Sequence, residues 1–195
     1  MINHLNAHFP PGKKFHYSDT NYQLLGLIIE KWTGKPLHEA YAEFIFVRAN
    51  MKNSYLHLYS PIDEIPQKNM APVYFKGEDI SGYKSISMSW ASGGIVSTNE
   101  DMLNFFKAFN EYKLVSETTH KKMHQWVNAN IGMSYGYGLM HFKFPFMPKK
   151  YRISGHSGSI GAIMYYCKSL DTYIIGSFNK VNYTRQPVMV AFKIL

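Results

Sequence analysis

The clearest pattern in the sequence is a helical one that follows a turn near the N-terminus. Residues 10–12, Pro-Pro-Gly, signal the turn. Apolar residues then recur at helical spacing until residues 34–36, Gly-Lys-Pro, end the pattern. The apolar positions are Tyr22, Leu25, Ile28, Ile29 and Trp32. This spacing predicts an amphipathic helix.

Three further helices are predicted before the sequence changes character. Residues 37–51 predict the second helix, whereas residues 53–92 are irregular, rich in Ser, Pro, Gly and Tyr, and typical of an insertion over a site. Thr98 and Asp101 stand at the spacing of a capping box and predict a helix start. Ser116 predicts the cap of another helix. The apolar positions after these two caps are Met102, Leu103, Phe105, Phe106, Phe109, Met123 and Trp126.

The last third of the chain has the pattern of a β-sheet. β-Branched and aromatic residues form three runs, 151–154, 161–168 and 172–179. The last two runs are joined at residues 169–171, which predicts an antiparallel hairpin, and a final helix starts near Tyr183. Helices first and an antiparallel hairpin last predict an α+β fold.

Composition limits the class of protein. The chain has 195 residues and 46% hydrophobic residues, enough for a packed core without disulfides or a metal. It contains no repeat and no low-complexity linker, so we expect one domain or part of one. No apolar run approaches the roughly 18 residues that span a bilayer, and no apolar segment precedes a signal cleavage site. Cys167 is the single cysteine, which excludes an intramolecular disulfide and leaves the redox compartment open.

The net charge is +8, and residues 98–195 carry most of the excess. The lysines there occur as scattered pairs, such as Lys121-Lys122 and Lys149-Lys150, and not as a continuous basic run. We therefore predict no nucleic-acid surface. The excess indicates either a solvated face or an anionic substrate, because a local positive field accelerates the encounter with an anion.

Two short segments carry residues capable of chemistry. Tyr17, Ser18 and Asp19 precede the first predicted helix, where free backbone amides bind anions, although the same residues also suit a plain helix cap. Around His156, small residues and glycines fill residues 154–161, and glycines in strands mark close approach by a ligand. The alternative there is a tight corner between strands with a solvent-exposed histidine.

These two segments and a third, residues 91–98, carry a family resemblance. The sequence resembles the serine β-lactamase and penicillin-binding-protein superfamily, in the class C-like branch that includes D,D-peptidases, D-aminopeptidases and esterases. The matching blocks, in order, are Pro11-Gly12, Tyr17-Ser18-Asp19-Thr20-Asn21-Tyr22 with Leu24-Leu25-Gly26, Gly93-Gly94-Ile95-Val96-Ser97-Thr98, Gly136-Tyr137-Gly138-Leu139 and Gly155-His156-Ser157-Gly158. The resemblance implies part of a β-lactamase/D,D-peptidase-like fold, with a helical region, C-terminal antiparallel strands and a terminal helix.

The resemblance implies two catalytic residues. Tyr17 matches the tyrosine of the family's Tyr-x-Asn element, which shuttles a proton to and from the nucleophile and the leaving group. A phenol does this only where nearby cations lower its pKa toward the working pH. His156 replaces the lysine of the Lys-Thr-Gly element, as in many esterase and peptidase relatives, and would supply the positive or hydrogen-bonding group beside the tyrosine.

The resemblance also implies a substrate-binding set. Asp19 stands where the family often has an asparagine that binds the substrate amide, and it adds a negative charge. Ser157 would offer a hydroxyl to a substrate carboxylate, and Gly158 completes the Lys-Thr-Gly element. The backbone amide of Ser159 would form half of an oxyanion hole. Neither a cofactor nor a metal is implied.

The family's nucleophile has no counterpart in this chain. It is the serine of a Ser-x-x-Lys motif on a buried helix before the tyrosine element, and no serine precedes Tyr17. Two Ser-x-x-Lys matches, at residues 81–84 and 177–180, follow Tyr17 and open no apolar helix. We therefore expect residues 1–195 to be a single incomplete domain that lacks the N-terminal strands and the nucleophile helix, and to be inactive alone.

Other chemistries fit less well. Around Ser157 and Ser159 the Gly-x-Ser-x-Gly pattern of a nucleophile elbow is incomplete. Two i, i+4 histidine pairs resemble metal ligands, but no glutamate follows the first histidine of either pair and no third ligand is apparent. We interpret both pairs as solvated histidines. The pairs are His4 with His8 and His120 with His124.

Two functions stay open. One is a serine hydrolase that forms an acyl-enzyme on an amide, ester or β-lactam bond; the other is a non-catalytic binding module for an anionic peptide or cell-wall fragment. Either would bind a small molecule or peptide, with no nucleic acid and no membrane span. The absent strands would leave an unpaired sheet edge and an open apolar helix face that favour self-association. Relatives are mostly periplasmic or membrane-associated, and the compartment of this chain stays open.

Overall fold

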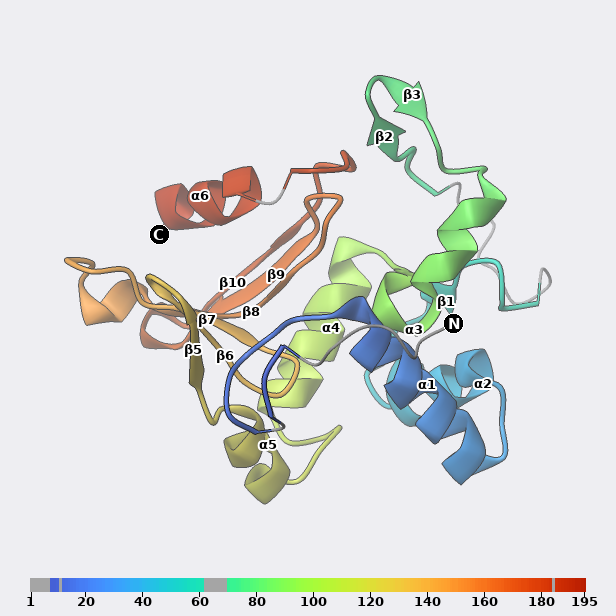
Figure 1. Ribbon diagram of the computed structural model, residues 1–195, viewed down its shortest axis with the longest axis horizontal. Helices are drawn as coiled ribbons and strands as arrows, with labels where there is room; N and C mark the ends of the chain where they lie inside the picture. The colour runs from blue at the N-terminus through green and yellow to red at the C-terminus, as the bar shows by residue number, and fades with distance from the viewer. Residues whose placement is uncertain (1–7, 11, 62–69, 184) are drawn as a thin grey trace.

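The structure is a computed structural model that describes residues 8–10, 12–61, 70–183 and 185–195. Pro11 and His4, which the sequence analysis singled out, lie outside these ranges. A six-stranded antiparallel sheet with one helix against it forms one side of the molecule, and most of the helices form the other (Figure 1). The α+β fold is thereby confirmed.

The sheet is a meander in which each strand pairs with its neighbours along the chain. Its order is β10-β9-β8-β7-β6-β5. The strands are β5 (Val127–Asn130), β6 (Met133–Tyr135), β7 (Met140–Phe142), β8 (Ile153–Ser157), β9 (Ile163–Cys167) and β10 (Thr172–Gly176). The three predicted runs became β8, β9 and β10, and the predicted hairpin turns through the 3-10 helix η5 (Lys168–Leu170) and Asp171, whose φ is 46°.

Side chains alternate between the two faces of the sheet, so each face has its own apolar cluster. Ile163, Tyr165 and Cys167 point to the face covered by α6 (Arg185–Ile194), where they pack with Val188. The intervening residues of β9 face α4 (Asn99–Asn110) on the other side. The sheet is therefore buried between two helical layers.

Helix α4 lies between the sheet and the remaining helices. Phe106 and Phe109 pack toward the sheet, whereas Ala108 packs with Phe46 of the neighbouring helical segment. The next helix, α5 (Glu117–Met123), begins as predicted, because Ser116 Oγ accepts the backbone N–H of Thr119 at 3.2 Å. It ends before Trp126, which the sequence had placed on it.

Only one of the two hydrogen bonds of the predicted capping box of α4 forms. Thr98 Oγ1 accepts the N–H of Asp101 at 3.1 Å. The Asp101 carboxylate does not return the contact; it accepts the N–H of Asn53 at 2.6 Å and the hydroxyl of Ser54 at 2.8 Å. Asp101 is thus a buried link between α4 and the segment that leads into β1.

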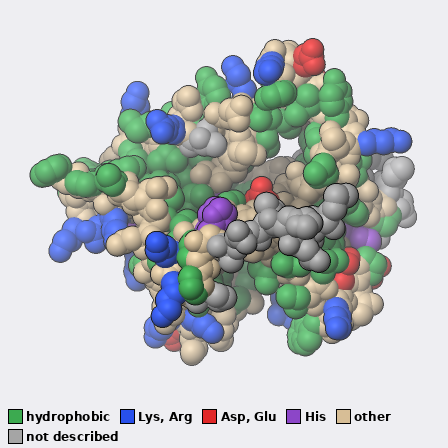
Figure 2. Space-filling view, viewed as in Figure 1, with side chains coloured by type: hydrophobic (Ala, Val, Ile, Leu, Met, Phe, Trp, Pro, Cys, Tyr) green, Lys and Arg blue, Asp and Glu red, His purple; other side chains and the backbone are tan. Residues whose placement is uncertain are grey.

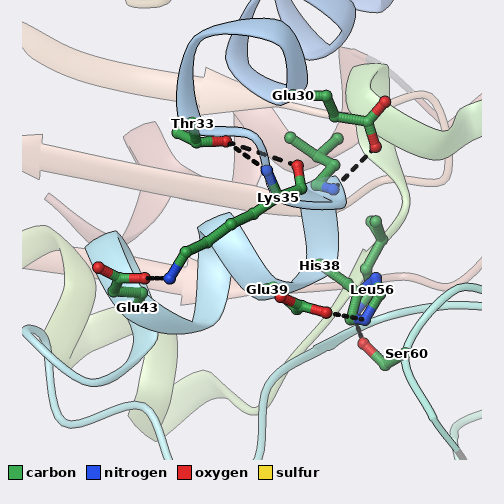
Figure 3. A network of polar contacts seen from close by, with 9 residues as sticks. Glu30, Thr33, Lys35, His38, Glu39, Glu43, Leu56 and Ser60 are labelled. Carbon is green, nitrogen blue, oxygen red and sulfur yellow. Dashed lines mark hydrogen bonds and ion pairs between the residues drawn. The ribbon is translucent and has the colours of Figure 1, made fainter.

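The second predicted helix is shorter and irregular. It consists of α2 (Leu37–Tyr41) followed by a π-helix, η1 (Ala42–Phe46). Polar contacts fix the corner where α1 ends, as Figure 3 shows: Glu30 Oε1 accepts the N–H of Leu37 at 2.9 Å, and Lys35 pairs with Glu43. The same view includes the hydroxyl of Ser60, which accepts the N–H of Leu56.

Helix α1 (Asp19–Thr33) leaves most of its apolar side exposed, whereas an amphipathic helix is expected to bury that side. Its buried residue is Gly26, which packs against Trp90 and Ala91 of α3 (Trp90–Gly93). Most of its apolar positions face outward: Ile28 is 59% exposed and Trp32 is 82% exposed. The helix was predicted correctly, but only Tyr22 and Ile29 of its apolar stripe are half-buried.

Residues 53–92 contain only short elements, as predicted, within the part that the structure describes. They are β1 (Tyr55–Leu56), which pairs with β4 (Ile95–Val96), the small hairpin β2 (Tyr74–Phe75) and β3 (Glu78–Asp79), and the 3-10 helix η3 (Lys84–Ser89). A bridge between Tyr74 and Lys180 joins the hairpin to the chain after β10. Across the described residues, no helix is both long and apolar enough to cross a membrane.

Candidate active site

Four aromatic side chains from three distant segments meet beside the sheet. Tyr17 precedes α1, Tyr22 lies in its first turn, Tyr135 ends β6 and His156 lies in β8. The Tyr17 ring centroid is 5.7 Å from that of Tyr22, 5.8 Å from that of Tyr135 and 6.3 Å from that of His156. The fold therefore brings the two predicted catalytic residues, Tyr17 and His156, to one place.

Hydrogen bonds connect three of these four side chains. The hydroxyls of Tyr22 and Tyr135 are 2.6 Å apart, and the Tyr135 hydroxyl is 2.9 Å from Nε2 of His156. Burial lowers the pKa of His156, although the negative charge of Asp19 opposes the shift. The imidazole is then neutral near pH 7 and can accept the Tyr135 hydroxyl hydrogen, which leaves Tyr135 to accept from Tyr22.

Tyr17 lies beside His156, but the pKa of its phenol is raised. Its side chain is 38% exposed at the edge of the cluster. Partial burial raises the pKa of the phenol well above its usual value, and the negative charge of Asp19 raises it further. Among the described residues no cation offsets this shift, so the condition for proton transfer by Tyr17 is not met by these residues alone.

The segment around the start of α1 leaves its backbone amides without a side-chain cap. Ser18 holds the N-cap position with extended backbone angles, but its side chain makes no capping hydrogen bond. Asp19 is the first helical residue and is exposed. The plain capping role that the sequence offered for Ser18 is therefore wrong.

Strand β8 sends the predicted binding residues in different directions. His156 pairs with Met164 on the α4 side of the sheet, whereas Ser157 pairs with Ile163 on the α6 side. The Ser157 hydroxyl donates to the sulfur of Met140 at 3.6 Å. Side-chain alternation thus separates the Ser157 hydroxyl from the imidazole of His156.

Gly158 and Ser159 follow the strand in a tight turn. The N–H of Gly158 donates to the carbonyl of Ala162 at 2.8 Å, and the carbonyl of Ser159 accepts the N–H of Asn182 at 3.0 Å. Ser159 is exposed. The turn lies next to β8 and is anchored to the chain after β10.

The two Ser-x-x-Lys matches lie in turns. The Ser81 hydroxyl donates to Asp79 beside the β2–β3 hairpin. Ser177 follows β10 and accepts the N–H of Asn179 at 3.1 Å. Neither serine opens a helix, in agreement with their rejection as nucleophiles from the sequence.

The histidine pair on α5 is packed and not solvated. The rings of His120 and His124 are 4.3 Å apart, and that of His120 lies 4.6 Å from Phe109. Both side chains are only partly exposed, so the interpretation as solvated histidines is wrong for this pair. Within the described ranges, no group of three or more His, Cys, Asp or Glu side chains is arranged to hold a metal ion.

Two members of the aromatic cluster, Tyr22 and Tyr135, were not predicted from the sequence as site residues. Tyr22 was predicted as part of an apolar helix face, and Tyr135 was not singled out. The hydroxyl bond between them joins positions far apart in the sequence, so no local pattern could have indicated it. A cavity of about 400 Å³ lies elsewhere, and the residues that line it include His38, Phe46, Lys52, Ser54 and Tyr55.

Comparison with known proteins identifies relatives along most of the chain. The family model described as Beta-lactamase matches residues 1–192. A D-aminopeptidase of Cereibacter sphaeroides is 27% identical in a 161-residue alignment that covers 79% of this chain and 29% of that protein. A D-aminopeptidase of Brucella ovis is 27% identical over 159 residues, with the same coverage. The chain thus spans less than a third of these curated relatives.

Solved structures share the fold. A D-stereospecific amidohydrolase from Streptomyces sp. is 25% identical with a TM-score of 0.78, covering 94% of this chain and 56% of that chain. The D-amino acid amidase from Ochrobactrum anthropi SV3 is 23% identical with a TM-score of 0.77, covering 95% of this chain and 59% of that chain. At this identity the amidase shows the fold alone.

Proposed function

The chain belongs to the Beta-lactamase family, and on that premise we propose that it forms part of a serine hydrolase of the acyl-enzyme type. The observation that supports this most directly is the approach of Tyr17 to His156, whose ring centroids are 6.3 Å apart although they come from opposite ends of the chain. A tyrosine beside a half-buried imidazole is an arrangement suited to proton transfer during acylation and deacylation.

In this proposal Tyr17 exchanges a proton with the nucleophile and the leaving group. His156 holds the tyrosine cluster in place through Tyr135 and offers a neutral hydrogen-bonding group to the reaction centre. Asp19 binds the amino or amide end of the substrate, and the backbone amide of Ser159 belongs to the oxyanion hole. Ser157 and Gly158 shape the strand end where the substrate lies.

We propose amides of D-amino acids as the substrate class. The support is that the relatives are described as D-aminopeptidase, D-stereospecific amidohydrolase and D-amino acid amidase. The carboxylate of Asp19, exposed at the start of α1, suits a substrate with a free amino group because the two charges attract.

We further propose that residues 1–195 are part of one domain whose nucleophile lies on a segment outside them. The exposed apolar side of α1 supports this, because Ile28 and Trp32 form a surface typical of a helix packed against another element. A cation from the same segment would also lower the pKa of Tyr17, which the described residues alone raise.

The test compares this polypeptide with one extended upstream through a Ser-x-x-Lys motif. Both are treated with a fluorophosphonate probe, intact mass is measured and any adduct is mapped. We expect no stoichiometric adduct on residues 1–195 and one adduct on the upstream serine of the longer protein. An adduct on Ser81, Ser157 or Ser177 of the shorter chain would contradict the proposal.

The longer protein then allows the catalytic roles to be measured. Tyr17→Phe should lower kcat/KM for a D-amino acid p-nitroanilide by roughly 10²–10⁴-fold, as expected for loss of a general acid–base group. Tyr112→Phe, at an exposed tyrosine away from the cluster, is the matched control and should leave the rate unchanged. A protein that binds anionic peptides but never labels or turns over would instead support the non-catalytic binding module.

A further inference from the structure

One end of the sheet carries two neighbouring loops that the proposed reaction does not use. Residues 143–152, here called the basic loop, connect β7 to β8 and include the 3-10 helix η4 (Lys149–Tyr151). The turn between β5 and β6 lies directly beside it, because the N–H of Lys143 donates to the carbonyl of Gly132 at 2.8 Å. In Figure 1 the basic loop is the orange segment that projects at the left edge.

Each of these loops presents a fully exposed apolar side chain. Phe146, in the basic loop, is 105% exposed, and Ile131, in the β5–β6 turn, is 89% exposed. Two large apolar side chains exposed to this degree on neighbouring loops would gain free energy on transfer from water. Figure 2 shows hydrophobic side chains that project at this end of the molecule.

The backbone holds Phe146 outward by a costly conformation. Its φ is 67°, in the left-handed region that bulky residues rarely adopt. The neighbouring Phe144 is anchored, since its ring lies 5.9 Å from that of Phe142 and 5.5 Å from that of Phe192. The N–H of Met147 donates to the carbonyl of Phe144 at 3.2 Å and closes the turn. The exposed Phe146 ring therefore belongs to a turn that is anchored through Phe144.

The surroundings of these apolar tips are strongly positive. The sequence contains no acidic residue between Glu117 and Asp171. The exposed cations of the basic loop are Lys143, Lys149, Lys150 and Arg152. None of them forms an ion pair within the described residues. In Figure 2 lysine and arginine side chains gather just below the projecting apolar group.

We propose that this end of the protein docks on the surface of an anionic phospholipid bilayer. The cations would lie over the lipid headgroups, and Phe146 and Ile131 would enter the boundary between headgroups and acyl chains. Charge complementarity selects the anionic surface, and the apolar tips distinguish it from a nucleic acid, because the exposed side chains of Phe146 and Ile131 carry no hydrogen-bond donors. The surface lies on loops separate from Tyr17 and His156, so this docking does not depend on catalysis.

Vesicle sedimentation with the full 195-residue chain tests the proposal. We expect the protein to sediment with vesicles of phosphatidylcholine and phosphatidylserine, to remain in solution with phosphatidylcholine alone, and to dissociate as salt is raised. Phe146→Ser with Ile131→Ser should reduce the bound fraction at least about tenfold. Val47→Ser, at an apolar residue that is 77% exposed on the helical side, is the matched control and should bind normally.

The charge contribution is tested by a matched pair of double variants. Lys149→Gln with Lys150→Gln should also lose binding to anionic vesicles. Lys31→Gln with Lys52→Gln removes the same charge from exposed positions in the helical part. This variant should still bind anionic vesicles. Equal losses in the two pairs would mean that net charge alone drives binding and would overturn the proposal.

A fluorescence measurement tests directly whether position 146 enters the bilayer. Cys167 is fully buried, so a Phe146→Cys variant can be labelled at position 146 with an environment-sensitive dye. The emission should shift to the blue on addition of anionic vesicles, whereas a dye at Val47→Cys should not respond. The proposal would be overturned if the protein bound a soluble polyanion such as nucleic acid and Phe146→Ser left that binding unchanged. A dimer in solution that depends on Phe146 would also overturn it.

Discussion

Gly155 in β8 crosses Met164 in β9 so closely that a Cβ atom on the glycine would lie 1.9 Å from the Met164 carbonyl oxygen. The clashing atom belongs to the backbone, so no side-chain movement can relieve it. Because Gly155 directly precedes His156, the glycine fixes how β8 presents the imidazole. A glycine in the middle of a strand is thus required by the close approach of two backbones.

Gly155→Ala should destabilise the protein by at least about 1–3 kcal/mol, the range for overpacking, and displace His156. The measurement is the free energy of unfolding in urea. Gly176→Ala in β10 is the control, since nothing lies within 4 Å of a Cβ there, and it should be close to neutral. Equal stability of the two variants would contradict this account of the β8–β9 crossing.

Tyr135→Phe should weaken the aromatic cluster at its centre. The change removes the hydroxyl that lies 2.6 Å from that of Tyr22 and 2.9 Å from His156 Nε2, and it leaves this nitrogen of the half-buried His156 without that partner. We expect a loss of about 1–3 kcal/mol. Tyr22→Phe should cost less, because Tyr22 is partly exposed to water. A double-mutant cycle for the two tyrosines should give a coupling energy, and simple additivity would argue against the bond.

Stability should fall as the pH falls below the ordinary imidazole pKa of about 6.5. Burial lowers the pKa of His120, His141 and His156 in the folded protein. Below 6.5 the unfolded chain therefore binds protons that the folded chain does not, which favours unfolding until the lowered pKa values are passed. Thermal unfolding across this range should show the decrease. His156→Gln should reduce it and the exposed His8→Gln should not.

Asp101→Asn should be among the more damaging single changes in the helical part. The carboxylate accepts two hydrogen bonds, from the N–H of Asn53 and the hydroxyl of Ser54, and it is 2% exposed. We expect a loss of about 2–3 kcal/mol, measured by urea unfolding. Glu100→Gln, one residue earlier and exposed, should change stability by only about 0.3–1 kcal/mol.

The isolated chain should self-associate through its uncovered surfaces. These are the apolar side of α1 and the outer edge of β10, which is unpaired within the described part of the chain. Sedimentation velocity should show oligomers that Ile28→Lys with Trp32→Lys, or the edge variant Ile175→Lys, shifts toward monomer. Val47→Lys, at a residue that is 77% exposed on the helical side, should not do so. A monomeric unmodified chain would refute the expectation.

Local patterns predicted the elements of this fold better than their orientations. The first helix follows from apolar spacing and the glycine after Thr33, and the start of α5 from Ser116. The short strands β5, β6 and β7 were not predicted individually, because three or four residues carry too little periodicity to distinguish a strand from a loop. The outward apolar face of α1 was also missed, since periodicity gives the width of a stripe and not what covers it.

For the site, the sequence indicated Tyr17 and His156 through their motifs, and the structure brings them together. It did not indicate Tyr135, whose role depends on a hydroxyl contact across the sheet. It also grouped Ser157 with His156 because they are adjacent, whereas adjacent residues in a strand face opposite ways. The direction of a side chain depends on strand register, which motif matching does not contain.

The sequential strand order of the sheet also bears on how the protein reaches its folded state. Every pairing from β5 to β10 joins strands that follow one another along the chain. Each pairing therefore closes only a short loop. Pairings with small sequence separation have a low contact order and form quickly. The helical part depends on distant contacts instead, such as β1 with β4 and α1 with α3. We therefore expect the sheet to form before the distant contacts of the helical region.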